Sequence, residues 1–158
     1  MITIGVQTKG FLPERDIEEA FDIIARAGFD KIDFNMDAFL KSDDVYKGRP
    51  NSFFDYSTEE LICYFDQYKK VMREKSIECS QMHAPYPFLL ANRIEQNKYM
   101  QEVVIPKSLL VAKSLEVPWV VLHPCKLRYA YGVEREFEEN LKYYQSLIPI
   151  LKKLQIGI

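Results

Sequence analysis

Short stretches rich in β-branched and apolar residues alternate along this chain with longer stretches of helical periodicity. The strand-like stretches span residues 2–7, 31–35, 77–82 and 118–122, and a fifth begins at residue 156. The helical stretches span residues 13–27, 58–76, 93–115 and 134–154. Such alternation predicts parallel strands joined by right-handed helical crossovers. The 158 residues contain no linker or low-complexity stretch, so we expect one α/β domain over 1–158.

The apolar faces of the helices follow from their spacing. In the second helix the predicted inward side chains are Leu61, Phe65, Tyr68 and Met72. In the last helix they are Phe137, Leu141, Tyr144, Ile148 and Leu151. Pro106 predicts a kink in the third helix, or a second helix starting there, and Pro149 predicts an interruption of the last helix.

Residues 36–57 form a long segment without a clear strand or helix pattern. The segment contains Gly48, Pro50 and several Asp and Ser residues. Irregular segments of this length are uncommon in compact domains and are typically functional lids or disordered. We interpret its Asp43 and Asp44 as a solvated face.

Composition excludes several classes of protein. The net charge is −2 and no polybasic run is present, so nucleic acid is not expected as the main partner. No apolar run approaches the ~20 residues of a membrane span, and the start lacks the pattern of a signal peptide, so no membrane association is expected. Three cysteines without CxxC spacing predict a reduced, cytoplasmic protein.

The two histidines of the chain occupy the same local frame. His83 follows the strand-like residues 77–82, and a proline comes two residues after it. His123 follows residues 118–122, and a proline comes directly after it. The carboxyl ends of parallel strands meet at one edge of a sheet, so both imidazoles are expected at one mouth. A neutral imidazole there can bind a divalent metal or transfer a proton. The alternative is a polar cap bonded to a neighbouring loop.

Three segments resemble the xylose isomerase-like barrel superfamily, which holds sugar isomerases, sugar-phosphate isomerase/epimerases and apurinic endonucleases. Residues 27–33 resemble its second strand, residues 82–86 its third-strand motif, and residues 112–115 with 119–124 the end of its third helix and its fourth strand. Glu116 and Cys125 replace glycines that the family usually has, and the residues after Tyr86 depart from the endonuclease pattern. A complete barrel takes ~250 residues. The resemblance therefore implies a partial TIM barrel, its N-terminal half: four β/α units plus the start of a fifth strand.

The resemblance also implies site residues and a cofactor. His83 would be catalytic, His83 and His123 would bind a divalent metal (Zn, Mn or Mg), and Asp33, Tyr86 and Lys126 would contact a sugar or sugar phosphate. Asp33 could also support a ligating histidine. The plainer alternatives are a solvated residue or a helix-capping contact for Asp33, packing in the core or in a loop for Tyr86, and a surface lysine for Lys126. Arg128 could join Lys126 in holding a phosphate. In the family, the remaining metal carboxylates come from the fifth and later strands. The alternative is therefore that this chain binds no metal by itself.

Three functional hypotheses follow. The first is a metal-dependent sugar-phosphate isomerase or epimerase, incomplete in this chain. The second is a zinc phosphodiesterase of the apurinic-endonuclease type. The third is a non-catalytic half-barrel that a partner completes. An open half-barrel leaves strand edges unpaired and is expected to expose inward apolar faces, which predicts self-association or marginal stability.

Overall fold

The structure is a computed structural model that describes residues 3–49 and 51–158. Its sheet has four parallel strands in the order β1-β2-β3-β4. These strands are β1 (Gly5–Gln7), β2 (Lys31–Asn35), β3 (Glu78–His83) and β4 (Val120–Val121). Gly157 pairs in parallel with Trp119, which confirms the predicted start of a fifth strand. The part of the predicted first strand at residues 1 and 2 lies outside the described residues.

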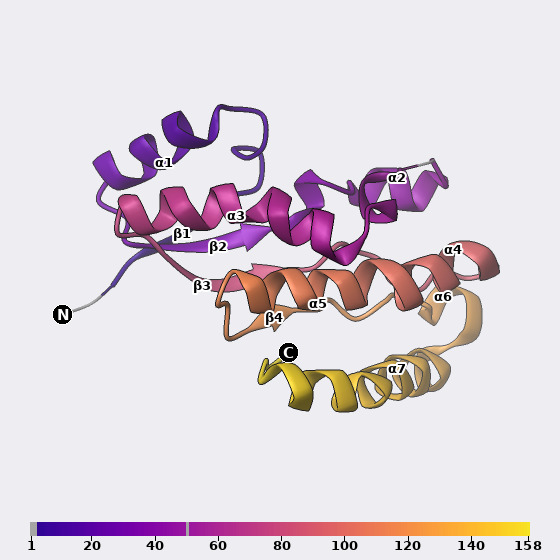
Figure 1. Cartoon of the computed structure of the whole chain (residues 1–158). Helices are drawn as coiled ribbons and strands as arrows, with labels where there is room; N and C mark the ends of the chain where they lie inside the picture. The colour runs from indigo at the N-terminus through magenta and orange to yellow at the C-terminus, as the bar shows by residue number, and fades with distance from the viewer. Residues whose placement is uncertain (1–2, 50) are drawn as a thin grey trace.

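The helices follow one another along the sheet (Figure 1). The long helices are α1 (Ile17–Arg26), α3 (Thr58–Glu74), α5 (Ile105–Ser114) and α7 (Val133–Leu154). Each of them contacts the next one in this series, as successive crossovers of a (β/α) barrel do. None of the described helices is long and apolar enough to cross a bilayer.

The segment 36–57 is more regular than its sequence predicts. It forms three short elements, η1 (Met36–Ala38), α2 (Ser42–Lys47) and η2 (Phe53–Asp55). Local side-chain bonds start the first two of them: the Asn35 carboxamide accepts from the backbone N–H of Asp37, and the Asp37 carboxylate accepts from that of Ser42. Asx-type bonds of this kind build tight turns without an apolar pattern.

The ends of the helices differ from the predicted ones for identifiable reasons. The first helix begins at Ile17, because the Asp16 carboxylate caps the backbone N–H groups of Glu18 and Glu19. In the third helical stretch, α4 (Ile94–Tyr99) passes through a π turn, η3 (Met100–Val104), into α5, which starts just before Pro106. The predicted interruption at Pro149 is wrong, because α7 continues through it. Gln145, whose carbonyl loses its helical donor, is exposed to water. A short helix, α6 (Arg128–Tyr131), was not predicted.

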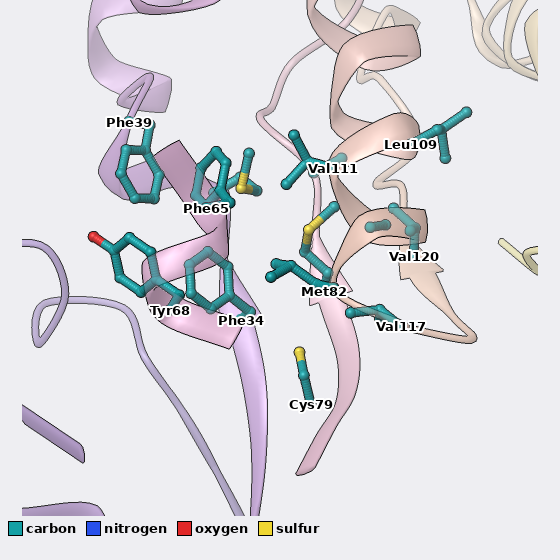
Figure 2. Packing of buried hydrophobic residues seen from close by; sticks show 14 of the residues in the cluster. Phe34, Phe39, Phe65, Tyr68, Cys79, Met82, Leu109, Val111, Val117 and Val120 are labelled. Atoms are coloured by element: carbon teal, nitrogen blue, oxygen red, sulfur yellow. The ribbon is translucent and has the colours of Figure 1, made fainter. Parts of the chain in front are cut away.

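The core lies between the sheet and the helices. Ile32 and Phe34 of β2 are fully buried. An aromatic group surrounds Phe34, and an aliphatic group surrounds Met82 (Figure 2). The predicted inward residues of α3, Leu61, Phe65, Tyr68 and Met72, are all buried. For α7 the prediction is right for Tyr144 and Leu151, which are partly buried and pack against the core. It is wrong for Phe137, Leu141 and Ile148, which are exposed, and the buried side chains of α7 include Tyr143 and Leu147 instead.

The opposite face of the sheet, which would line a barrel, is polar. Side chains of a strand alternate between faces, so Lys31 and Asp33 point away from the buried Ile32 and Phe34. Lys31 forms an ion pair with Glu78 on β3 at 2.9 Å. The expectation of an apolar inward face is therefore wrong for this part of the sheet, because its side chains bond to one another across the strands.

The start of α3 allows a stability prediction. The Ser57 hydroxyl accepts from the backbone N–H of Glu60, and the Glu60 carboxylate accepts from that of Ser57. We expect Ser57→Ala to lower the free energy of unfolding by about 1 kcal/mol, the usual value of an N-cap. Urea unfolding measures it. Ser52→Ala is the matched control, because Ser52 precedes η2 without a side-chain cap bond and should change stability very little.

Candidate functional site

Asp33 and His83 form a bonded pair on neighbouring strands. The Nδ1 atom of His83 lies 2.8 Å from Oδ1 of Asp33, and both side chains are 16% exposed. A carboxylate can only accept, so in the neutral imidazole Nδ1 carries the proton and the lone pair stays on Nε2. The pair therefore selects the tautomer whose free nitrogen can accept a proton or bind an electrophile.

Two glutamine amides hold the other oxygen of Asp33. Gln7 and Gln81 both donate through Nε2 to Oδ2 of Asp33, at 3.2 and 3.1 Å. The sheet places them there, since Asp33 stands opposite Gln7 in β1 and opposite Gln81 in β3. We call Gln7 and Gln81 the amide clamp. It fixes which carboxylate oxygen faces His83.

His123 lies beside His83, as the sequence predicts. Their ring centroids are 5.2 Å apart with 37° between the planes, and the Tyr86 ring stands edge-on to His123 at 5.6 Å. Partial burial lowers the pKa of His123, and the nearby His83 and Lys9 lower it further. His123 is thereby biased toward the neutral imidazole.

Both histidines line one cavity of about 400 Å3. The ten residues around it are Lys9, Asn35, Asp37, Ser42, His83, Ala84, Tyr86, His123, Pro124 and Lys126. Lys9 forms an ion pair with Asp37 at 3.1 Å. The Tyr86 hydroxyl accepts from that of Tyr46 at 3.0 Å, and burial raises the pKa of Tyr86. The cavity therefore combines imidazole, phenol and ammonium groups with one carboxylate.

The structure brings together most of the residues that the sequence singles out. His83, His123, Tyr86 and Lys126 line the cavity, while Asp33 lies behind His83 with both oxygens bonded. Arg128, the other candidate for phosphate binding, lies elsewhere, because its guanidinium is bonded to Glu136.

Sequence reasoning missed four residues near the site: Gln7, Gln81, Lys9 and Asp37. Their common signal is position, because each lies in, or within two residues of, the carboxyl end of a strand. A search for polar residues at all strand ends, rather than for histidines, would have found them.

The donor set does not complete a metal site. Asp33 is occupied by His83 and the amide clamp, and Asp37 is bonded to Lys9 and Ser42. This leaves one nitrogen of His83 and the ring of His123. Within residues 3–49 and 51–158, no group of three or more His, Cys, Asp or Glu side chains could hold a metal ion. Zinc normally takes three or four protein ligands, so these residues alone do not fit it.

The loop that carries His123 and Lys126 is anchored to α7 by two buried polar side chains. The Asn140 carboxamide accepts from the backbone N–H of Cys125 and donates to its carbonyl, at 2.7 and 2.9 Å. The Glu136 carboxylate accepts from the backbone N–H groups of Leu127 and Arg128. The position of His123 therefore depends on α7.

The Glu136 anchor predicts a pH dependence of stability. Its hydrogen bonds, first of all those from the Arg128 side chain, lower the pKa of Glu136. A carboxylate with a lowered pKa stabilises the fold above its unfolded-state pKa, and this contribution is lost as the pH falls through the folded-state pKa. We expect Glu136→Gln to show a smaller loss of melting temperature than the wild type between about pH 7 and about pH 3. Thermal melts measure this, and Glu138→Gln, an exposed change on the same helix, should keep the wild-type pH dependence.

Comparisons with known proteins agree with the fold. No family model matches the chain. A curated relative, "Probable endonuclease 4" of Mycoplasma mycoides subsp. mycoides SC, is 27% identical over 117 residues, which is 72% of this chain and 38% of the relative. A solved D-psicose 3-epimerase, in the presence of D-fructose, superposes with a TM-score of 0.61 at 12% identity over 98% of this chain and 50% of its own. A solved xylose isomerase domain containing protein from Salmonella typhimurium LT2 superposes with a TM-score of 0.52 at 16% identity. The match covers 99% of this chain and 50% of that protein's chain.

These comparisons define the class of fold. The chain has the fold of half of a xylose isomerase-like (β/α) barrel, as the sequence motifs predict. It spans about half the length of these solved structures and 38% of the curated relative.

Proposed function

We propose that this chain forms a sugar-binding half of an isomerase or epimerase barrel, in which His83 accepts a proton from the substrate. The observation that carries the proposal is the Asp33–His83 pair, which keeps the lone pair on Nε2 at a cavity that also holds His123 and Tyr86. A base with a fixed tautomer beside a polar cavity is what proton transfer at a carbon next to a carbonyl requires.

The proton transfer of the isomerisation is balanced within the substrate and His83. Nε2 takes the proton from the carbon beside the carbonyl, and the electron pair moves onto the carbonyl oxygen to give an enediolate. Return of the proton from His83 to the former carbonyl carbon, while the remaining hydroxyl proton passes from one enediolate oxygen to the other, interconverts aldose and ketose. Epimerisation needs a second acid on the opposite face of the enediolate to protonate the same carbon, while His83 gives up its proton to water. The described side chains do not complete a metal site. If ligands from elsewhere complete one, His83 and His123 would be its imidazole ligands.

The cavity rim supports a phosphorylated substrate. Lys9 and Lys126 contribute ammonium groups to the same cavity, and Lys9 is already paired with Asp37. Lys126 is exposed and forms no ion pair with the described residues. We therefore assign phosphate binding to Lys126, sugar-ring contact to Tyr86, and the support of His83 to Asp33.

Binding and hydrogen exchange test the proposal together. Titration calorimetry with a ketose phosphate and with the same unphosphorylated ketose should show tighter binding of the phosphate, weakened roughly tenfold by Lys126→Met. Lys113→Met, an exposed change on α5, is the control. In D2O the chain should exchange the hydrogen next to the carbonyl, and His83→Asn should stop this exchange. Absence of both binding and exchange would overturn the proposal.

The endonuclease hypothesis is kept as the second candidate, on one observation. The curated relative that matches 72% of this chain is a probable endonuclease 4. A DNA enzyme would bind the phosphate backbone through a basic surface, whereas this chain has a net charge of −2. Salt-sensitive binding of duplex DNA with an abasic site, without binding of sugars, would favour this candidate over the isomerase.

A half-barrel without catalysis of its own is the third hypothesis. It predicts sugar binding without hydrogen exchange until a partner supplies the remaining wall of the barrel.

The cytoplasmic location predicted from the cysteines stays a prediction. Cys63, Cys79 and Cys125 are free thiols in the structure.

A further inference from the structure

One face of α7 is apolar and uncovered. Val133, Phe137, Leu141 and Ile148 are 60%, 68%, 42% and 44% exposed. Together with Tyr144 and Leu151, which pack on one side against the core and are only partly exposed, they recur every three or four residues and form a stripe along the helix. We call these six residues the α7 stripe. The helix buries a different stripe, with Tyr143 and Leu147, against the rest of the domain.

The four central residues of the α7 stripe are arranged symmetrically along the helix. Leu141 and Tyr144 lie equally far from the point between residues 142 and 143, and so do Phe137 and Ile148. Two copies of α7 packed antiparallel would therefore place Phe137 opposite Ile148 of the second copy, and Leu141 opposite Tyr144 of the second copy. A surface that is complementary to itself is what a twofold dimer requires.

The charges beside the stripe favour the same antiparallel order. Glu134 and Lys152 are exposed and are 18 residues apart, which is five helical turns, so they lie on the same side of α7. Neither forms an ion pair with the residues that the structure describes. An antiparallel second copy would bring its Lys152 beside Glu134, and the twofold axis makes this pair twice. A parallel copy would instead place Glu134 level with Glu134 and Lys152 level with Lys152, so that no opposite charges would meet.

The apolar surface continues beyond the helix. Trp119 is 59% exposed, and it lines a shallow cavity of about 450 Å3 together with Ile148 and Leu151 of the stripe. A monomer seldom leaves so continuous an apolar surface uncovered.

We propose that the α7 stripe is a homodimer interface, covered by α7 of a second copy in antiparallel orientation. The proposal goes beyond the proposed function and does not rest on it, since no stripe residue lines the cavity of His83 and His123.

Light scattering and sedimentation of the whole chain test the proposal. The wild type should reach twice the 18.6 kDa chain mass with a concentration-dependent equilibrium. Phe137→Glu should weaken the dimer roughly a hundredfold, as loss of a central aromatic contact does. Ile94→Glu, at a residue that is 79% exposed outside the stripe, should leave the dissociation constant unchanged.

Charge exchange tests the orientation. Glu134→Lys and Lys152→Glu should each weaken the dimer roughly three- to tenfold, and the double variant should restore it. Circular dichroism confirms that each variant is folded. A wild type that stays monomeric would overturn the proposal, because the stripe would then not be covered by a second copy. A dimer that tolerates Phe137→Glu, or charge variants without mutual rescue, would also overturn it.

Discussion

Asp33→Asn is expected to slow hydrogen exchange by about 10²- to 10⁴-fold, the usual contribution of a general base, without unfolding the chain. The reason is the amide clamp. Gln7 and Gln81 both donate to the Oδ2 position of residue 33. An asparagine at residue 33 would therefore turn its carboxamide oxygen toward the two glutamine amides. Its NH2 group would then face Nδ1 of His83. Nδ1 would have to accept, the proton would move to Nε2, and the lone pair at the cavity would be lost.

The tautomer can be measured apart from activity. Nitrogen-15 NMR of the wild-type imidazole should show the proton on Nδ1, and the Asp33→Asn variant should show it on Nε2. Asp37→Asn is the matched control, since it changes a carboxylate at the same cavity that does not contact His83. Adding Gln7→Leu and Gln81→Leu to Asp33→Asn should free the amide to turn and return part of the Nδ1–H form. An unchanged tautomer in Asp33→Asn would contradict the role of the clamp.

The sequence predicts the pair of histidines but not the clamp, and the sheet explains the difference. Parallel strands meet at their carboxyl ends whatever their register, so His83 and His123 had to come close. The clamp depends on register. Ile32 stands opposite Cys79, but an irregularity follows, so that Asp33 stands opposite Gln81 rather than Ser80. A shift of one residue cannot be inferred from strand propensities, and it decides which side chain reaches Asp33.

The prediction for α7 is wrong at Phe137, Leu141 and Ile148 because the helix has two apolar stripes. Periodicity alone favours the stripe with Phe137 and Leu141. The buried face is instead set by Glu136 and Asn140, which satisfy backbone groups of the loop at Cys125, Leu127 and Arg128. Polar residues that complete a buried hydrogen-bond network outweigh the gain from a more apolar face, because unpaired backbone groups are costly to bury. Such a network becomes visible only when the loop is placed.

The largest effect on stability is expected for Phe34→Ala. Phe34 is fully buried, and its ring packs edge-on against Phe65 and Tyr68 with centroids 5.9 and 5.4 Å away. Removing it deletes the centre of the aromatic group between β2 and α3 (Figure 2). We expect the free energy of unfolding to fall by about 3–5 kcal/mol, the usual cost of Phe→Ala in a core.

Chemical and thermal unfolding measure this loss. In a domain of this size it corresponds to a drop in melting temperature of about 6–20 °C. Phe34→Leu should lower the free energy of unfolding much less, because leucine refills most of the space left by the ring. Tyr129→Ala, at a residue that is 94% exposed, should stay within about 0.5 kcal/mol of the wild type. If Phe34→Ala were no more destabilising than Tyr129→Ala, β2 would not lie under α3, and Asp33, the next residue of that strand, would not be held against His83.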